Sequence, residues 1–348
     1  MNHLAKENNN FNLVRLLACF QVLIYHSYSF YHKIDDTLFF KFIWLFPGVV
    51  IFFSISGFLI AKSFDYSSIK SFSIKRFLRI YPGLIVNISA TFLLLYFLRF
   101  IKINLDSIKY FVSQLTIFQF YVPESFKKFG SGHHPNGALW TISVELQFYF
   151  LFLVTAILLG WKKRSIKFKN IVTSFLIIVS CLINFLSNSH MYTETISFKL
   201  LFNSIFYHFT FFGIGMLFWI NFQNLKIIFI GKFKYWSIIL MIIILMIIFF
   251  DITIRRYQYE NLSFLYLLIL VFTTFSFVFS LNGLSYRLLG KTDISYGTYI
   301  YHCLVINLFI ILNVNECLIP LTWLISINLG LLSWVLIEKG FLAKKSSL

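Results

Sequence analysis

Apolar stretches of about twenty residues recur along this chain of 348 residues, and they constrain its fold more than any other feature. A helix of that length crosses the roughly 30 Å of hydrocarbon in a bilayer. Hydrophobic residues make up 59% of the sequence and charged residues 12%, a balance typical of membrane proteins. We therefore expect an all-α polytopic membrane protein.

Ten stretches are long enough to be transmembrane helices. Placing the N-terminus in the cytoplasm assigns 19 Lys and Arg residues to cytoplasmic segments, against 10 at or beyond the outer ends of spans. The positive-inside rule therefore predicts that both termini are cytoplasmic. The predicted spans are 11–31, 43–62, 82–101, 138–160, 170–188, 198–220, 235–251, 261–282, 294–313 and 319–337.

No segment between the spans is long enough to fold alone, since the longest covers about 102–137. We expect one transmembrane domain over 1–348, with its motifs inside 11–337 and no separate soluble domain. The formal net charge of +17 falls in short loops, which indicates membrane lipid rather than nucleic acid as a partner. The four cysteines lack the spacing of a metal site or a disulfide scaffold, so we predict neither.

Arg15 and His26 lie inside the first apolar stretch, FNLVRLLACFQVLIYHSYSF. A residue that can carry charge inside a membrane span is costly enough to indicate a function. Eleven residues make about three helical turns, so both side chains share one face, separated by roughly 16 Å of helical rise. The first helix thus carries a cation near one end and a titratable imidazole toward the other.

Arg76 and Arg79 stand three residues apart in SIKRFLRIYPG, just before Pro82. That spacing puts both guanidinium groups on one face of a helix. Paired arginines suit phosphate, because each presents a planar fork of donors. The alternative is a positive-inside anchor that contacts anionic lipid, and the sequence does not choose between the two.

Glu145 is the one acidic residue that falls well inside a predicted span, in NGALWTISVELQFYF. A buried carboxylate must be paired or protonated, and Tyr149 lies one turn further along the same face. Glu145 and His26 both fall in the outer halves of their helices, so we expect the carboxylate to hold the imidazole and raise its basicity. A structural pair with Arg15 or Arg99 is the alternative.

His302 ends a second polar stripe, which also contains Ser295 and either Thr298 or Tyr299 at helical spacing in ISYGTYIYH. A single histidine in a helical core is more often a structural hydrogen bonder than a ligand. His302 therefore enters the prediction as a supporting residue. Ser143, Trp140, Tyr149 and Tyr299 are placed in the same supporting group.

Five motifs together resemble the integral membrane acyltransferase family 3, bacterial proteins that O-acylate surface polysaccharides. The resemblance spans most of the chain and occurs in the family's order. One departure is Ala138, where the family often has Ser. The matching segments are RLLACFQVLIYH with Arg15 and His26, FFSISGFLI, KRFLRIYPG with Arg76 and Arg79, NGALWTISVELQFY with Asn136, Trp140, Thr141, Glu145, Phe148 and Tyr149, and ISYGTYIYH with Ser295, Tyr296, Tyr299 and His302.

The resemblance implies a multi-pass enzyme of the bacterial inner membrane that moves an acetyl group from cytoplasmic acetyl-CoA to a sugar hydroxyl. The acceptor would be a surface polysaccharide, such as lipopolysaccharide, or its lipid-linked precursor. His26 would be the general base, held by Glu145, while Arg15, Arg76 and Arg79 would bind the donor. No metal or prosthetic group is implied. Direct transfer and an acyl-enzyme both remain open, with Cys19 and Cys303 near the histidines.

Two other classes of protein use charged residues inside membrane spans. A transporter or flippase for an anionic or sugar-linked substrate is the main alternative, although the sequence shows neither internal repeats nor paired broken helices. A sensor or scaffold would leave the spacing of Arg15 and His26 unexplained. Transfer of label from acetyl-CoA to glycan separates the enzyme from both.

Overall fold

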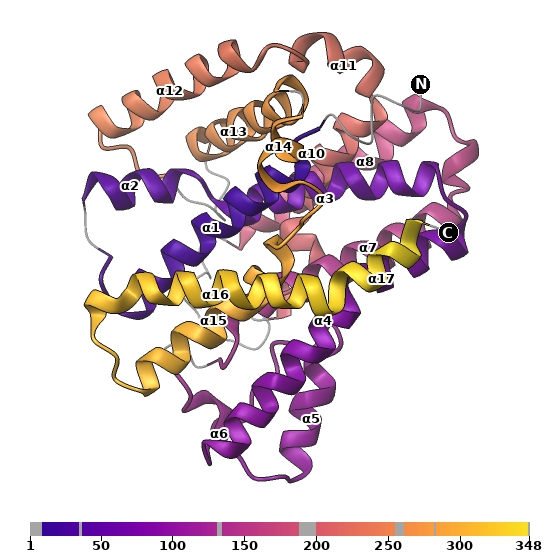
Figure 1. Ribbon diagram of the computed structural model, residues 1–348. Coiled ribbons are helices and arrows are strands. Elements are labelled where there is room, and N and C mark those ends of the chain that lie inside the picture. The colour runs from indigo at the N-terminus through magenta and orange to yellow at the C-terminus, as the bar shows by residue number, and fades with distance from the viewer. Residues whose placement is uncertain are drawn as a thin grey trace. The chain divides into compact units, whose positions relative to one another are not determined.

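The computed structural model describes residues 9–34, 37–130, 134–187, 200–254, 261–281 and 283–346 (Figure 1). Their regular structure is entirely helical. Among these residues, eight helices are long and apolar enough to cross a membrane, or nine if two helices bent by 74° count as one span. A further apolar helix of 17 residues lies at Ser295–Ile311. The prediction of an all-α polytopic protein is confirmed, and each predicted span overlaps a helix.

The helices of more than ten residues are α1 (Phe11–Phe30), α3 (Gly48–Asp65), α4 (Ile69–Phe97), α7 (Trp140–Leu158), α8 (Ile166–Leu186), α10 (Ile205–Ile220), α12 (Phe233–Phe249), α13 (Asn261–Ser280), α15 (Ser295–Ile311) and α16 (Ile319–Ser333). Shorter helices are α2 (Leu38–Leu45), α5 (Leu105–Gln114), α6 (Glu124–Lys127), α11 (Phe222–Phe229), α14 (Leu284–Leu289) and α17 (Lys339–Ser346). Single turns of 3₁₀ helix lie at Gly137–Leu139, Trp161–Lys163 and Glu316–Leu318.

The chain forms two compact units. The first draws on Met1–Ala18, Thr37–Tyr66 and Phe152–Thr292. The second draws on Cys19–Asp36, Ser67–Leu151 and Asp293–Leu348. The helices α1 and α7 each pass from one unit into the other. All the predicted site residues except Arg15 belong to the second unit.

In the first unit, α3 and α10 pack with their backbones in contact. A Cβ atom added to Gly57 would lie 1.9 Å from the carbonyl oxygen of Phe212, and one added to Gly215 would lie 1.9 Å from that of Ser54. Small residues allow this approach, which drives helix association where lipid surrounds the helices. The aromatic rings of α3, α10 and α13 then fill the space beside the contact, as Phe218 shows by stacking on Phe275 at 4.2 Å between centroids.

In the second unit, α15 is the buried centre, with α16 lying beside it (Figure 1). A Cβ atom on Gly330 would meet the backbone nitrogen of Thr298 at 2.6 Å, so these two helices also approach closely. Two buried asparagines on other segments reach the same carbonyl of α15. Asn87 and Asn136 donate to the oxygen of Ile300 at 2.9 and 2.7 Å. These bonds fix the position of the helix that carries the predicted polar stripe.

The helix that carries the predicted third span, 82–101, begins well before that span, because α4 runs from Ile69 to Phe97. Its first turns are rich in cations, which a search for apolar stretches passes over. Ser68 caps the helix by accepting from the backbone nitrogen of Ser71 at 3.1 Å. Pro82 therefore lies inside α4 rather than at its start, and Arg76 and Arg79 are helical residues, as their spacing predicted.

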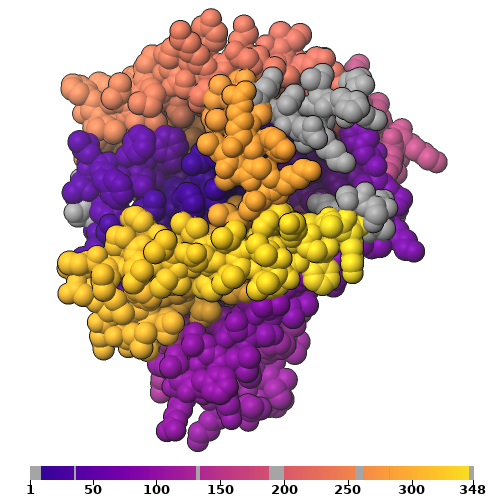
Figure 2. Space-filling model, in the orientation of Figure 1, coloured from indigo at the N-terminus to yellow at the C-terminus, as the bar shows by residue number. Residues whose placement is uncertain are grey.

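The last helical segment also continues beyond its predicted end at 337. After α16 the chain passes through one π-helical stretch, Trp334–Glu338, into α17. Glu338 is 2% exposed, so Glu145 is not the only acidic residue embedded in an apolar helix. Outward-facing side chains of this segment, including Leu324 and Leu336, are exposed, and Figure 2 shows the atoms of the segment at the surface. Such an apolar surface suits contact with lipid.

Candidate active site

Two of the predicted histidines meet in the second unit. The Nδ1 atom of His26, on α1, lies 2.9 Å from the Nε2 atom of His302, on α15, although the residues are 276 positions apart. Their rings are nearly parallel, with an interplanar angle of 19° and 5.2 Å between centroids. His302 is fully buried, whereas His26 is half-buried. The pair thus joins a fully enclosed imidazole to one that is partly exposed.

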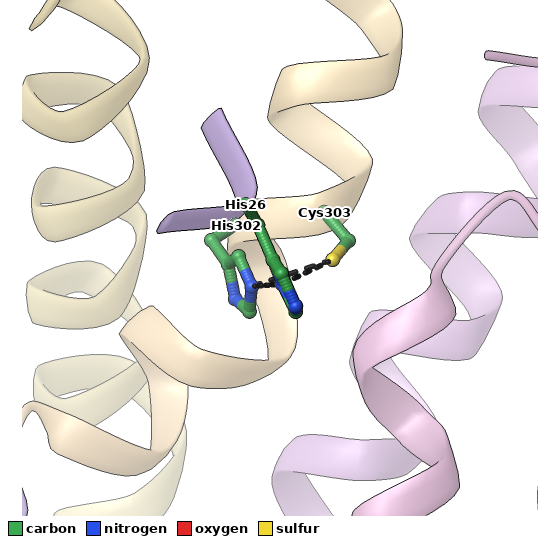
Figure 3. A group of neighbouring side chains, drawn as sticks. All are labelled: His26, His302 and Cys303. Atoms are coloured by element: carbon green, nitrogen blue, oxygen red, sulfur yellow. Dashed lines mark hydrogen bonds between the residues drawn. The ribbon is translucent and has the colours of Figure 1, made fainter. Parts of the chain in front are cut away.

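Cys303 is the third member of this group, and its thiol faces both imidazoles (Figure 3). The sulfur lies 3.3 Å from Nε2 of His302 and 3.5 Å from Nδ1 of His26. All three candidate ligand atoms fall within 4.8 Å of one another, the closeness that a metal ion requires. The separation of 2.9 Å between the two nitrogens is also that of an ordinary hydrogen bond.

The stripe on α15 is buried, as its helical spacing predicted, and it holds His302 in place. The carbonyl oxygen of Tyr299 lies 2.5 Å from Nδ1 of His302. The hydroxyl of Tyr299 accepts from the hydroxyl of Thr141 at 2.9 Å, which connects α15 to α7. Tyr299 therefore binds the histidine through its backbone and the neighbouring helix through its side chain.

Arg79 forms an ion pair that the sequence did not reveal. Its Nη2 atom lies 2.8 Å from Oδ2 of Asp293, and the two side chains are 12% and 7% exposed. The other oxygen of Asp293 accepts from the hydroxyl of Ser295 at 2.5 Å. The guanidinium also lies over the ring of Tyr296, at 5.7 Å from the centroid. Arg79 thereby ties α4 to the start of α15.

Glu145 and Arg76 are brought together through Tyr149. The hydroxyl of Tyr149 donates to Oε1 of Glu145 at 2.5 Å. The guanidinium of Arg76 lies over the ring of the same tyrosine, at 5.6 Å from its centroid. The two arginines of α4 thus each lie over a tyrosine, and the carboxyl group of Glu145 belongs to this polar group. The hydrogen bond of Glu145 expected with His26 stays a prediction.

The remaining predicted residues take separate places. Arg15 is half-buried on α1, three turns before His26, in the part of that helix that belongs to the first unit. Trp140 is the first residue of α7 and is half-buried. The buried Ser143 donates from its hydroxyl to the carbonyl of Ile117 at 2.6 Å. This hydrogen bond connects α7 to the segment between α5 and α6.

Asp293 and Glu338 were missed by the sequence reasoning. Asp293 stands two residues before Ser295, the first residue of α15. A carboxylate at the start of a predicted helix is the sequence signal that could have marked it. Glu338 comes directly after the last predicted span, which ends at 337, so nothing in the sequence indicated that it would be buried. Its Oε1 atom accepts from the hydroxyl of Ser333 at 2.9 Å. Both acids lie near Arg79, which they attract.

The fold and this group of residues define a multi-pass membrane protein in which two histidines from distant helices are in hydrogen-bond contact. A family model described as an acyltransferase domain matches residues 8–338, and the chain belongs to this acyltransferase 3 family. The protein is therefore an O-acyltransferase, which favours the enzyme over a transporter or flippase.

Two similar proteins carry informative names. Nodulation protein 10 of Rhizobium leguminosarum bv. viciae is 28% identical over 370 aligned positions, which cover 99% of this chain and 96% of that protein. The O-acetyl transferase of Shigella phage Sf6 is 31% identical over 177 positions, which cover 49% of this chain and 51% of that protein. No solved structure matches the chain.

Proposed function

We propose that this O-acyltransferase moves an acetyl group from cytoplasmic acetyl-CoA to a sugar hydroxyl of a surface polysaccharide or its lipid-linked precursor. The bacterial inner membrane is the expected site of this reaction. The observation that carries the proposal is the half-buried imidazole of His26, held 2.9 Å from a fully buried second imidazole. The name of the phage relative, an O-acetyl transferase, supports acetyl as the transferred group.

The chemistry requires a base near the acceptor. A sugar hydroxyl is a weak nucleophile until its proton is removed, and a positioned imidazole is the side chain best suited to remove it near neutral pH. In the proposed step, His26 takes the hydroxyl proton as the oxygen attacks the thioester carbonyl. The carbon–sulfur bond then breaks, and the proton passes to the sulfur that leaves as the free thiol of CoA.

The arginines are proposed to bind the donor. Arg76 and Arg79 lie one turn apart on α4, and two guanidinium groups at that spacing match the phosphates of CoA. Asp293 already neutralises part of the charge of Arg79. Arg15 would guide the donor along α1 toward His26.

The supporting residues hold helices and reacting side chains in place and take no part in the making or breaking of covalent bonds. Tyr149 holds Glu145 by a hydrogen bond of 2.5 Å, and Tyr299 joins α15 to α7 through Thr141. Glu145 is proposed to influence the site through this polar group. Trp140 and Ser143, at the start of α7, would keep that helix in register.

Transfer of radiolabel from acetyl-CoA to polysaccharide tests the proposal. Membranes from cells that express the protein are incubated with labelled acetyl-CoA, and label is counted in the extracted polysaccharide. We expect the His26→Ala variant to lose about a hundred- to ten-thousandfold in rate, the usual range for removal of a general base.

His32→Asn is the matched control, because His32 is exposed just beyond α1. Its backbone φ of 54° is one that asparagine tolerates. Near-normal labelling by His26→Ala would overturn the role of base. An absence of label in polysaccharide with the wild-type protein, under conditions where it binds acetyl-CoA, would overturn the acceptor class.

A further inference from the structure

The proposed base has a second histidine as its partner, and the backbone determines where the protons of that pair lie. The carbonyl oxygen of Tyr299 can only accept a hydrogen bond, so Nδ1 of His302, at 2.5 Å, must be the donor. His302 is fully buried, and the cost of burying an extra charge keeps its ring neutral. A neutral imidazole carries one proton, which leaves Nε2 of His302 as an acceptor.

The second hydrogen bond then has a fixed direction. Nε2 of His302 lies 2.9 Å from Nδ1 of His26, and an acceptor requires a donor at that distance. His26 therefore carries its proton on Nδ1, and its lone pair is on Nε2. The thiol of Cys303, at 3.3 Å, is a weaker donor than an imidazole N–H and does not displace it.

We propose that His302 is a positioning residue that sets the tautomer of His26, through hydrogen bonds that run from His26 to His302 and on to the carbonyl of Tyr299. This inference rests on the proposed role of His26 as general base. The arrangement directs Nε2 of His26 to receive the proton of the acceptor hydroxyl. When that proton arrives, the imidazolium keeps its Nδ1–H bond to His302, so the pair need not reorganise during the reaction.

A pair of substitutions at His302 separates hydrogen bonding from packing. His302→Gln keeps an acceptor near Nδ1 of His26, whereas His302→Leu fills a similar volume and offers none. Loss of the group that orients a metal-binding histidine typically costs about ten- to a hundredfold in activity, and we expect an effect of that size for His26. We expect that loss in kcat for His302→Leu, with the KM for acetyl-CoA unchanged, and substantial recovery in His302→Gln.

His208→Leu is the matched control. His208 is also buried, at 2% exposed, and its Nε2 atom bonds to the carbonyl of Phe202 at 2.8 Å, but it lies in the first unit. A similar loss of activity in His208→Leu and His302→Leu, without recovery in His302→Gln, would assign His302 a structural role and overturn the inference.

A spectroscopic readout separates this inference from the proposed function. Protein labelled with ¹⁵N-histidine is reconstituted in lipid nanodiscs, and the signals of His26 are identified by their loss in His26→Ala. We expect Nδ1 of His26 to be the protonated nitrogen in the wild type and in His302→Gln, and a mixture of tautomers in His302→Leu. These NMR results do not depend on the activity of His26→Ala. If that variant kept its activity, the role of His26 as general base would be refuted, but the effect of His302 on the tautomer of His26 would not.

The converse result would refute the positioning role alone. If His26→Ala is inactive and the tautomer of His26 is unchanged in His302→Leu, the role of His26 as general base stands. The positioning role of His302 is then refuted. Metal analysis supplies the last outcome. One equivalent of zinc in the purified wild-type protein, absent from His302→Gln and Cys303→Ala, would show that the three side chains bind a metal in place of the proton on Nδ1.

Discussion

The buried ion pair of Arg79 and Asp293 predicts a charge-dependent loss of stability. Asp293→Asn removes the negative charge but keeps an oxygen that accepts from Ser295. Arginine stays protonated in proteins, so the variant leaves a nearly buried cation without its closest partner. At 2.8 Å and an effective dielectric constant of 20, the lost attraction is about 6 kcal/mol, and breaking such buried pairs typically costs about 3–5 kcal/mol.

The double variant tests whether charge is the cause. Arg79→Met together with Asp293→Asn removes both charges and keeps the volume, and replacing a whole buried pair in this way is often nearly neutral. We expect the double variant to be more stable than Asp293→Asn alone. Glu338 also attracts Arg79, which places the loss toward the lower end of the range.

Buried thiols provide the assay. Cys19 and Cys303 are enclosed in the folded protein, so a thiol-reactive dye labels them as the protein unfolds on heating. The half-buried Cys181 and the exposed Cys317 are replaced by Ser beforehand. An Asp293→Asn variant as stable as the wild type would refute the reasoning. A double variant that loses as much stability as the single variants Arg79→Met and Asp293→Asn lose together would also refute it.

The same variants separate the two roles of Arg79. If Arg79 also binds a CoA phosphate, Asp293→Asn should keep its affinity for acetyl-CoA while its stability falls. The double variant should then regain stability but bind acetyl-CoA more weakly, in a salt-sensitive way. Unchanged affinity in the double variant would leave donor binding to Arg76.

Three further predictions concern other contacts. Gly57→Ala forces α3 and α10 apart and should cost about 1–3 kcal/mol, seen as a lower unfolding temperature; an unchanged temperature would contradict the close packing. Tyr149→Phe removes the hydrogen bond to Glu145 and should cost about 1–3 kcal/mol by the same assay. The hydrogen bond from Lys41 holds the pKa of Asp251 below its usual value, which contributes stability that is lost as the pH falls through that pKa. In Lys41→Met the pKa of Asp251 should rise, measured by NMR titration of the carboxyl carbon.

The helices were predictable because twenty apolar residues have one stable arrangement in a bilayer. The positions of Arg76 and Arg79 on one helical face, and of Tyr299 and His302 on another, followed from the 3.6-residue period alone. The start of α4 was not predictable by the same means. Its first turns carry cations at the membrane surface, where a serine cap rather than apolarity sets the boundary.

The partners within the site depend on packing between distant segments. The period of α1 says which face carries His26, but not that α15 lies against that face, 276 residues later in the chain. The ion pair of Arg79 likewise depends on the approach of α4 to the start of α15. A single sequence predicts which face of its helix a side chain lies on. Contacts between helices, such as those of Gly330 and Asn136 with α15, determine which of these faces pack together.

The imidazole of His302 as a hydrogen-bond partner of His26 has a chemical consequence. A carboxylate beside the base would form an ion pair once the proton arrived, and it would have to be kept charged in an apolar surrounding before then. His302 is neutral, so the resting pair carries no charge and avoids that cost. In the proposed step, the positive charge appears only when His26 takes the acceptor proton, at the moment when negative charge develops on the thioester oxygen. The attraction between these two new charges then favours the transition state over the resting state, which is the condition for catalysis.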